Sequence, residues 1–230
     1  MRPTVSILQL DTHFPRIPGD VGSKASYLGP VEIIRIPQAS VSRIVSDRPD
    51  LIDIVPFEGA LRVARGEVIV TSCGFLSYWQ THLQRSARRP FISSALIALD
   101  GLAARFDPDE VMIVTFDAAR LTRLHLGAYP EFVTSIVGLP ADAHLRQVIE
   151  QDLSALDRDL ARAELVALVT AQQMPRHRHI LFECTNLPPY AAAVSAATGL
   201  PVTDILTQIE QVRPGTVERR ANGQATMGAA

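Results

Sequence analysis

The stretch "VIVTSCGFLSYW", Val68 to Trp79, joins a β-branched run to an amphipathic segment, and a thiol lies between the two. The run predicts a buried strand and the segment after it predicts a helix. "HILFECTNLPPY", His179 to Tyr190, repeats the arrangement, since an apolar run again ends in a thiol. Cys73 and Cys184 are the 2 cysteines of the 230-residue chain. We therefore predict that the chain uses one strand–thiol–helix unit twice, which indicates a coarse duplication.

The rest of the sequence alternates in the same way. Runs rich in Val and Ile predict buried strands at Val5 to Leu10, Val31 to Ile36, Val68 to Val70, Val111 to Phe116 and Ile180 to Phe182. Helical patterns lie between them, at Leu51 to Arg65, Phe75 to Ala87, Ile97 to Phe106, Ala118 to Tyr129, Leu145 to Met174 with interruptions, and Pro189 to Ala197. Strands that alternate with helices predict an α/β protein with a mostly parallel sheet covered by helices on both faces.

Composition excludes several classes of function. The formal net charge of -2 gives no electrostatic reason to expect nucleic acid or an acidic membrane surface as a partner. No run of 18 apolar residues predicts a membrane span, and the N-terminus does not resemble a secretory signal, so we expect a cytoplasmic protein. No glycine-rich phosphate loop follows a strand, so no nucleotide cofactor is expected. In a reducing compartment both cysteines stay free thiols.

Both thiols are expected at the carboxyl ends of parallel strands, where ligands bind in open α/β sheets. Amides of the following helix starts, such as those of Gly74 and Phe75, are expected to lower the pKa of a thiol and to bind a carboxylate. The alternative for either cysteine alone is a small, buried, unreactive side chain. Two matching positions, with no other cysteine in the chain, favour a reactive pair.

One segment stands outside the alternation of strands and helices. Asp11 to Pro30 is rich in proline and glycine and predicts a long ordered loop. We expect its first part, Asp11 to Gly22, to fold over or beside the site as a lid. His13 lies in this loop, and exposure at the surface is the expectation for its ring.

At these residues the sequence resembles the aspartate/glutamate/hydantoin racemase superfamily. The resemblance covers most of the chain and rests on "LDTHFPRIPGD", "VTSCGF", "VTFDAARLT" and "ECTNLPPY". Proteins of that family are cofactor-independent, and each of their two pseudo-symmetric α/β lobes carries one cysteine beside the cleft between them. The family's motifs commonly read Cys-Asn-Thr and Cys-Thr-His. Gly74 and Phe75 follow Cys73 here, and Thr185 and Asn186 follow Cys184, so glutamate is not the expected substrate.

The resemblance implies a division of the chain and a mechanism. The first lobe is expected at residues 1–95 plus about 200–212, the second at 96–199, and a loose tail at 213–230. Cys73 and Cys184 are implied as the two catalytic groups, one a thiolate base and the other a thiol acid on opposite faces of a carbon next to a carboxylate or amide. No metal is implied. The implied substrate-binding residues are Asp11, Thr12, Ser72, Gly74, Phe75, Thr115, Asp117, Thr185 and Asn186.

Two of these residues have simpler alternatives, because Asp11 can cap its loop and Asp117 can cap the helix expected from Ala118. The main prediction is an isomerase, a racemase or epimerase that acts on an amino acid, a hydantoin or another small carboxylate. Alternatives are a decarboxylase or other lyase of the same fold, and a non-catalytic protein that binds small acids. A homodimer or higher homo-oligomer is left open.

Overall fold

The computed structural model describes residues 2–218 and contains two four-stranded sheets, each wholly parallel. The first has the order β2-β1-β3-β4, with β1 at Val5–Leu10, β2 at Val31–Ile36, β3 at Val68–Thr71 and β4 at Phe91–Ile92. The second has the order β6-β5-β7-β8, with β5 at Val111–Thr115, β6 at Ile136–Gly138, β7 at His179–Phe182 and β8 at Val202–Thr203. The two sheets share one topology, and the predicted α/β architecture is confirmed.

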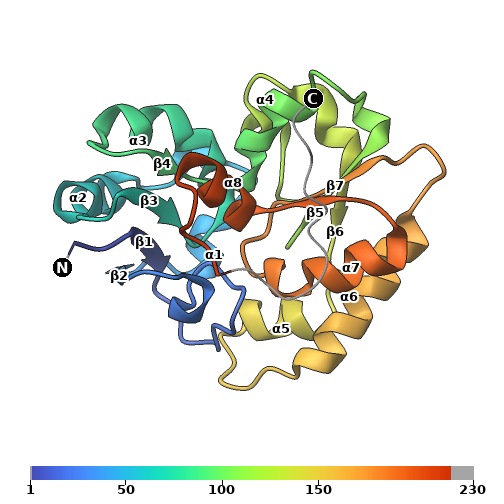
Figure 1. The fold of residues 1–230 in the computed structure, drawn as a ribbon, viewed down its shortest axis with the longest axis horizontal. Helices are drawn as coiled ribbons and strands as arrows, with labels where there is room; N and C mark the ends of the chain where they lie inside the picture. Colours follow the sequence, from blue (N-terminus) through green and yellow to red (C-terminus); the bar gives the residue numbers. More distant parts are fainter. Residues whose placement is uncertain (1, 219–230) are drawn as a thin grey trace.

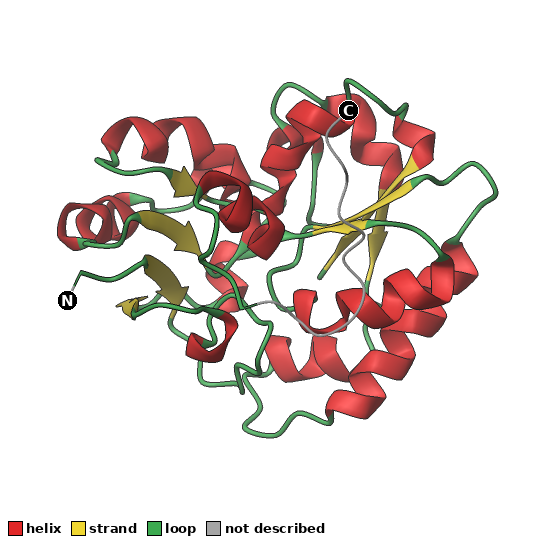
Figure 2. Ribbon diagram, in the orientation of Figure 1, coloured by secondary structure: helices red, strands yellow, loops and turns green. Residues whose placement is uncertain are grey.

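Helices cover the sheets (Figures 1 and 2). They are α1 at Val41–Ile44, α2 at Val55–Val63, α3 at Gln80–Ser86, α4 at Leu99–Leu102, α5 at His144–Glu150, α6 at Arg158–Gln172, α7 at Ala191–Thr198 and α8 at Ile205–Val212. Short 3-10 helices open or join several of them, among them Gly74–Trp79 before α3 and Pro188–Tyr190 before α7. Buried Val, Ile, Leu and Phe side chains from the strands and the inner helix faces form the core. No helix within residues 2–218 is long and apolar enough to cross a membrane.

The expected helix from Ala118 to Tyr129 does not form. A 3-10 helix at Arg123–Leu126 takes its place, and the side chains of Thr122 and His125 cap its start. Gly127, with φ 58°, then turns the chain out of the helical region. These local bonds and the glycine compete with a continuous helix, so an apolar periodicity of helical type folds here as turns.

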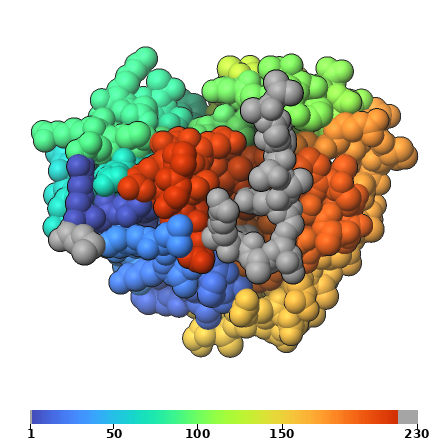
Figure 3. All heavy atoms as spheres, in the orientation of Figure 1, coloured from blue at the N-terminus to red at the C-terminus, as the bar shows by residue number. Residues whose placement is uncertain are grey.

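The C-terminal part returns from the second sheet to the first. β8 pairs with β7, whereas α8 packs against β4, and in Figure 3 the α8 region lies between the two halves on the face shown. Residues 213–218 follow the loop near Tyr27: Leu28 N donates to Thr216 O at 3.0 Å, and Arg213 Nε bonds Glu67 at 2.5 Å. The rest of the predicted tail, 219–230, lies outside the described residues. The division into lobes at residue 95 stays a prediction.

Candidate active site

A small cavity lies at the carboxyl ends of β1, β3 and β7. It is lined by Leu10, Thr12, Phe14, Arg16, Val41, Val45, Ser72, Cys73, Gly74, Phe75, Phe116, Ile149, Glu183, Cys184, Thr185 and Asn186. Its volume of about 30 Å³ suits one or two water molecules. An organic acid therefore needs the walls to move before it can enter.

Cys73 follows β3 by two residues and begins the 3-10 helix Gly74–Trp79. The thiol is buried, with 8% of the residue exposed. Burial and, after it, the charge of Glu183 raise the pKa of Cys73 to about 12, although a hydrogen bond from the Phe75 amide and the charge of Arg16 act in the opposite direction. The expectation of a lowered thiol pKa is therefore wrong, because desolvation outweighs the amide that the helix start provides.

Cys184 follows β7 by two residues and has the same pattern of backbone hydrogen bonds as Cys73. The Asn186 amide bonds its thiol as the Phe75 amide bonds Cys73. The Cys184 carbonyl accepts a hydrogen bond from Leu187 N at 3.1 Å. The Cys73 carbonyl accepts one in the same way from Leu76 N at 3.3 Å. Burial and then the charge of Glu183 hold the pKa of Cys184 well above its usual range.

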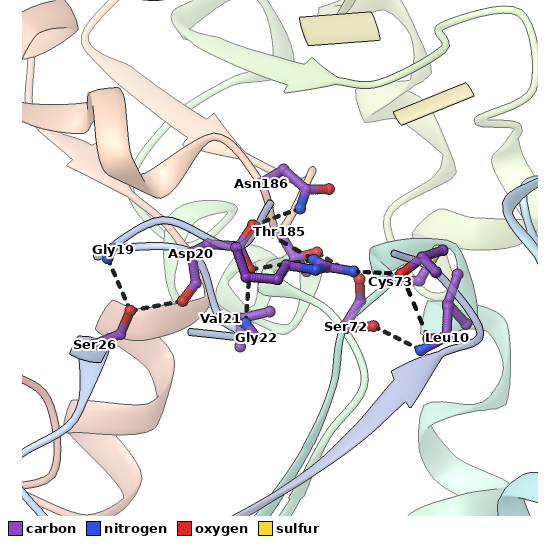
Figure 4. Close-up of polar contacts among 12 residues, drawn as sticks. Leu10, Gly19, Asp20, Val21, Gly22, Ser26, Ser72, Cys73, Thr185 and Asn186 are labelled. Carbon is purple, nitrogen blue, oxygen red and sulfur yellow. Dashed lines mark hydrogen bonds and ion pairs between the residues drawn. The ribbon is translucent and has the colours of Figure 1, made fainter. Parts of the chain in front are cut away.

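The loop after β1 forms one wall of the cavity. Arg16, whose side chain is 11% exposed, pairs with Asp20 at 3.2 Å and donates from Nη2 to Thr12 Oγ1 at 3.1 Å. Its guanidinium carbon lies 4.2 Å from the centre of the Phe14 ring. Asn186 Nδ2 donates to the second Asp20 oxygen at 2.6 Å, and Figure 4 shows these two side chains turned toward each other. The loop thus places the Arg16 guanidinium, whose charge Asp20 partly neutralises, in the cavity wall. The hydrogen bond between Asn186 and Asp20 joins the loop to the Cys184 segment.

Further bonds join the strand ends around the cavity. Thr185 Oγ1 donates to the Ser72 carbonyl at 2.7 Å, and the Leu10 amide donates to Ser72 Oγ at 3.0 Å (Figure 4). Val21 N donates to the Thr185 carbonyl at 3.4 Å. The hydroxyl groups of Ser72 and Thr185 are therefore engaged in hydrogen bonds with the backbone of the neighbouring segments.

Three of the expected site residues do not line the cavity. Asp11 is half-exposed, pairs with Arg35 at 3.4 Å and accepts the Gln38 amide at 3.2 Å. Asp117 accepts the Ala119 amide at 3.0 Å and pairs with Arg146 at 2.9 Å. Thr115 is fully buried and donates to Glu183 Oε2 at 2.6 Å. The other predicted residues, Cys73, Cys184, Thr12, Ser72, Gly74, Phe75, Thr185 and Asn186, all line it.

Sequence reasoning missed two charged residues in the cavity wall. Glu183 is fully buried, and burial raises its pKa to about 7 against a hydrogen bond from Thr115. Arg16 lies within "HFPRIPGD", where no sequence pattern marks it as a site residue. A lone acid at the end of an apolar run and a lone base among prolines were the available signals. Within residues 2–218 no group of three or more His, Cys, Asp or Glu side chains is placed to hold a metal ion.

Solved structures share this fold at low sequence identity. Allantoin racemase from Pseudomonas fluorescens matches with a TM-score of 0.56 and 12% identity, over 90% of this chain and 88% of its own. A variant of arylmalonate decarboxylase matches with a TM-score of 0.56 and 17% identity, over 94% of this chain and 98% of its own. Aspartate racemase from Picrophilus torridus matches with a TM-score of 0.52 and 11% identity, over 90% and 93%. The resemblance to the aspartate/glutamate/hydantoin racemase superfamily is confirmed at the level of the fold.

Sequence relatives point to a narrower group. Dimethylsulfoniopropionate lyase 5 of Emiliania huxleyi is 30% identical over 96% of this chain and 47% of its own length. Dimethylsulfoniopropionate lyase of Durusdinium sp. clade D is 27% identical over 94% of this chain and 75% of its own. Dimethylsulfoniopropionate lyase 6 of Emiliania huxleyi is 30% identical over 89% and 57%. The chain spans about half the length of the Emiliania relatives, and no protein-family model matches it.

These relatives correct the main functional prediction. Sequence similarity along most of the chain is to lyases, whereas the racemases match in fold alone. The prediction of an isomerase, with a racemase or epimerase reaction, is therefore wrong. The alternative of a lyase with the same fold is the better supported.

Proposed function

We propose that this protein is a lyase that eliminates a substituent from the β-carbon of a small carboxylate, with dimethylsulfoniopropionate as the first substrate to test. The observation that carries the proposal is the similarity to dimethylsulfoniopropionate lyases over 89% to 96% of the chain. The cavity supports it, since one cation and two thiols line the same small space.

Arg16 is the proposed anchor for the substrate carboxylate. A guanidinium matches a carboxylate in shape and charge, and this one belongs to the cavity wall. Asp20 offsets part of its charge and orients it, and the Phe14 ring supports its plane. A positive charge beside the carboxylate also stabilises the negative charge that develops when the adjacent carbon loses a proton.

Elimination requires one base and a leaving group. In dimethylsulfoniopropionate the α-carbon carries the acidic protons and the β-carbon carries the sulfonium. A cysteine thiolate takes an α-proton, the carbon–carbon double bond forms, and the β-carbon–sulfur bond breaks with its electron pair going to sulfur. The products are acrylate and dimethyl sulfide. Cys73 and Cys184 are the proposed candidates for the base, and the racemase requirement for two equal bases no longer applies.

The loop Asp11 to Gly22 is the proposed lid. Thr12, Phe14 and Arg16 belong to the cavity wall, and a cavity of about 30 Å³ is smaller than the substrate. Movement of this loop opens the wall on one side, and its return brings Arg16 to the bound carboxylate and excludes water.

The proposal is tested by incubating the protein with dimethylsulfoniopropionate and measuring dimethyl sulfide in the headspace. Arg16→Met should raise KM by at least about 100-fold, because a charge-assisted hydrogen bond to a carboxylate is lost. The matched control is the substrate's amide, which lacks the carboxylate. Wild type should discriminate against the amide, and Arg16→Met should not. Equal turnover of acid and amide by wild type would remove Arg16 from the account.

A further inference from the structure

Glu183 is a fully buried carboxyl group whose hydrogen bonds are incomplete. Oε2 accepts Thr115 Oγ1 at 2.6 Å, while Oε1 is buried without a hydrogen-bond partner. A buried carboxylate normally has its acceptors satisfied, so one left open deserves an explanation. The side chain belongs to the wall of the same cavity as both thiols.

The position of Oε1 is tied to the first cysteine. A Cβ atom added to Gly74 would lie 2.0 Å from Glu183 Oε1, so the carboxylate occupies the space beside the residue that follows Cys73. Glu183 is also the residue that precedes Cys184. One carboxyl group is therefore held between the two cysteine segments, and its charge acts on the pKa of both thiols.

The other charged groups near the cavity do not replace this carboxyl as a proton acceptor. The loop contributes Arg16 and Asp20, which pair with each other, and Asp20 also accepts from Asn186. Beyond β5, Asp117 pairs with Arg146. His125 packs edge-on against Phe75, and burial lowers its pKa to about 4, so its ring is neutral at pH 7.

We propose that Glu183 exchanges a proton with the cysteine pair, so that the reactive form of the site is a thiolate beside a protonated Glu183. In this step a thiol S–H bond breaks and an O–H bond forms on the carboxylate, with no change in total charge. For its place in turnover the inference rests on the proposed lyase activity. The thiolate then takes the α-proton, and dimethyl sulfide leaves. The proton on Glu183 passes to solvent when the loop opens. Glu183 acts through the thiols and is in that sense a positioning residue.

Protonation of Glu183 removes the negative charge that raises the pKa of both thiols, so a thiolate forms at lower pH beside the protonated carboxyl than beside the ionised one. A buried thiol with a pKa of about 12 is ionised to only about one part in 10⁵ at pH 7, whereas Glu183 with a pKa of about 7 is half ionised there. A substrate sulfonium cation bound in the cavity favours the thiolate further, because it places a positive charge near the sulfur.

The test is the pH dependence of cysteine alkylation by iodoacetamide, which needs no substrate and is followed for each cysteine by mass spectrometry. In wild type the rate should rise about tenfold per pH unit below pH 7 and become level above it. The level part arises because the carboxylate–thiol form and the reactive acid–thiolate form differ by no proton. In Glu183→Gln the rate should keep rising about tenfold per unit. A straight rise in wild type would overturn the inference.

Thr115→Val is the second variant, and it keeps Glu183. Its loss of the one hydrogen bond to Oε2 should raise the pKa of Glu183, so the level part should begin at higher pH. An unmoved onset would contradict the inference even if Glu183→Gln failed to fold. With dimethylsulfoniopropionate, kcat/KM of Glu183→Gln should fall by about 100-fold. A level part in the alkylation profile without any turnover by wild type would support the Glu183 inference while the proposed function fails.

Discussion

The segments around Cys73 and Cys184 share a pattern of backbone hydrogen bonds and differ in the side chain that fills the space between them. Each cysteine follows its strand by two residues. Its thiol accepts a hydrogen bond from the backbone amide two residues later, and its carbonyl accepts one from the amide three residues later. Gly74 follows the first thiol and leaves space, whereas Glu183 precedes the second and occupies that space. The shared backbone hydrogen-bond pattern thus carries an asymmetric set of side chains, which suits a reaction with one direction of proton transfer.

The largest expected effect separates the two cysteines. In a racemase that uses two bases, substitution of either base causes the same loss of activity. Elimination requires only one base. Of Cys73→Ser and Cys184→Ser, one should lose about 10³-fold in dimethyl sulfide release and the other less than about tenfold. Equal losses of about 10³-fold in both variants would contradict the asymmetric account.

Gly74→Ala tests the space that Gly74 leaves. The new Cβ would lie 2.0 Å from Glu183 Oε1 and 2.6 Å from the Glu183 carbonyl oxygen, so the variant should lose about 3 kcal/mol in the free energy of unfolding. Gly101→Ala in α4 is the matched control, because nothing lies within 4 Å of its added Cβ. The control should stay within about 1 kcal/mol of wild type in denaturant unfolding. Similar losses in both variants would show that the contact with Glu183 is unimportant.

Glu183, the other residue of this contact, predicts a pH dependence of the free energy of unfolding. Burial raises the pKa of Glu183 from 4.5 to about 7, so the folded state binds a proton that the unfolded state has released between these values. The stability contributed by this group therefore falls as pH rises from about 5 to 8. Glu183→Gln removes the effect, so its stability relative to wild type should increase by about 2 kcal/mol over that range. Urea unfolding at both pH values measures it, and a pH-independent difference would count against the raised pKa.

The smallest expected effect concerns the loop whose residues Thr12, Phe14 and Arg16 line the cavity. Asp152, in the left-handed conformation at φ 52°, accepts the His13 amide at 2.6 Å, the Phe14 amide at 2.8 Å and His13 Nδ1 at 2.9 Å. Partial burial raises the pKa of Asp152, but these hydrogen bonds lower it more. The bonds between Asp152 and the loop are therefore complete at neutral pH and weaken in acid. Asp152→Ala should cost about 1 kcal/mol.

Hydrogen exchange of the loop amides at residues 11–22 measures this effect. Exchange should be faster in Asp152→Ala than in Asp142→Ala, an exposed control in the same half of the chain. Unchanged exchange in Asp152→Ala would show that the loop is held elsewhere, for example by Asn186 and Asp20.

The sequence predicts the longest strands well because their apolar runs are long. The expected ranges Val5 to Leu10 and Val31 to Ile36 coincide with β1 and β2. The strands β4, β6 and β8 have two or three residues and leave no periodic signal. Their place in the sheets is decided by tertiary pairing, which local patterns do not contain.

The candidate site was predictable where the residue type was rare and hidden where burial decides the chemistry. Two cysteines at matching strand ends pointed to the cavity that both thiols line. Glu183 and Arg16 become informative only when the structure shows one fully buried and the other in the cavity wall. Burial also reverses the expected direction of the thiol pKa shifts, because each thiol receives one backbone amide, from Phe75 or Asn186, and desolvation outweighs it.

The most direct test of the account is one incubation of the wild-type protein in heavy water with dimethylsulfoniopropionate and L-aspartate together. Headspace analysis follows dimethyl sulfide, and mass spectrometry follows deuterium at the α-carbon of aspartate. The account predicts dimethyl sulfide in proportion to enzyme and no deuterium in aspartate. Deuterium in aspartate without release of dimethyl sulfide would contradict it.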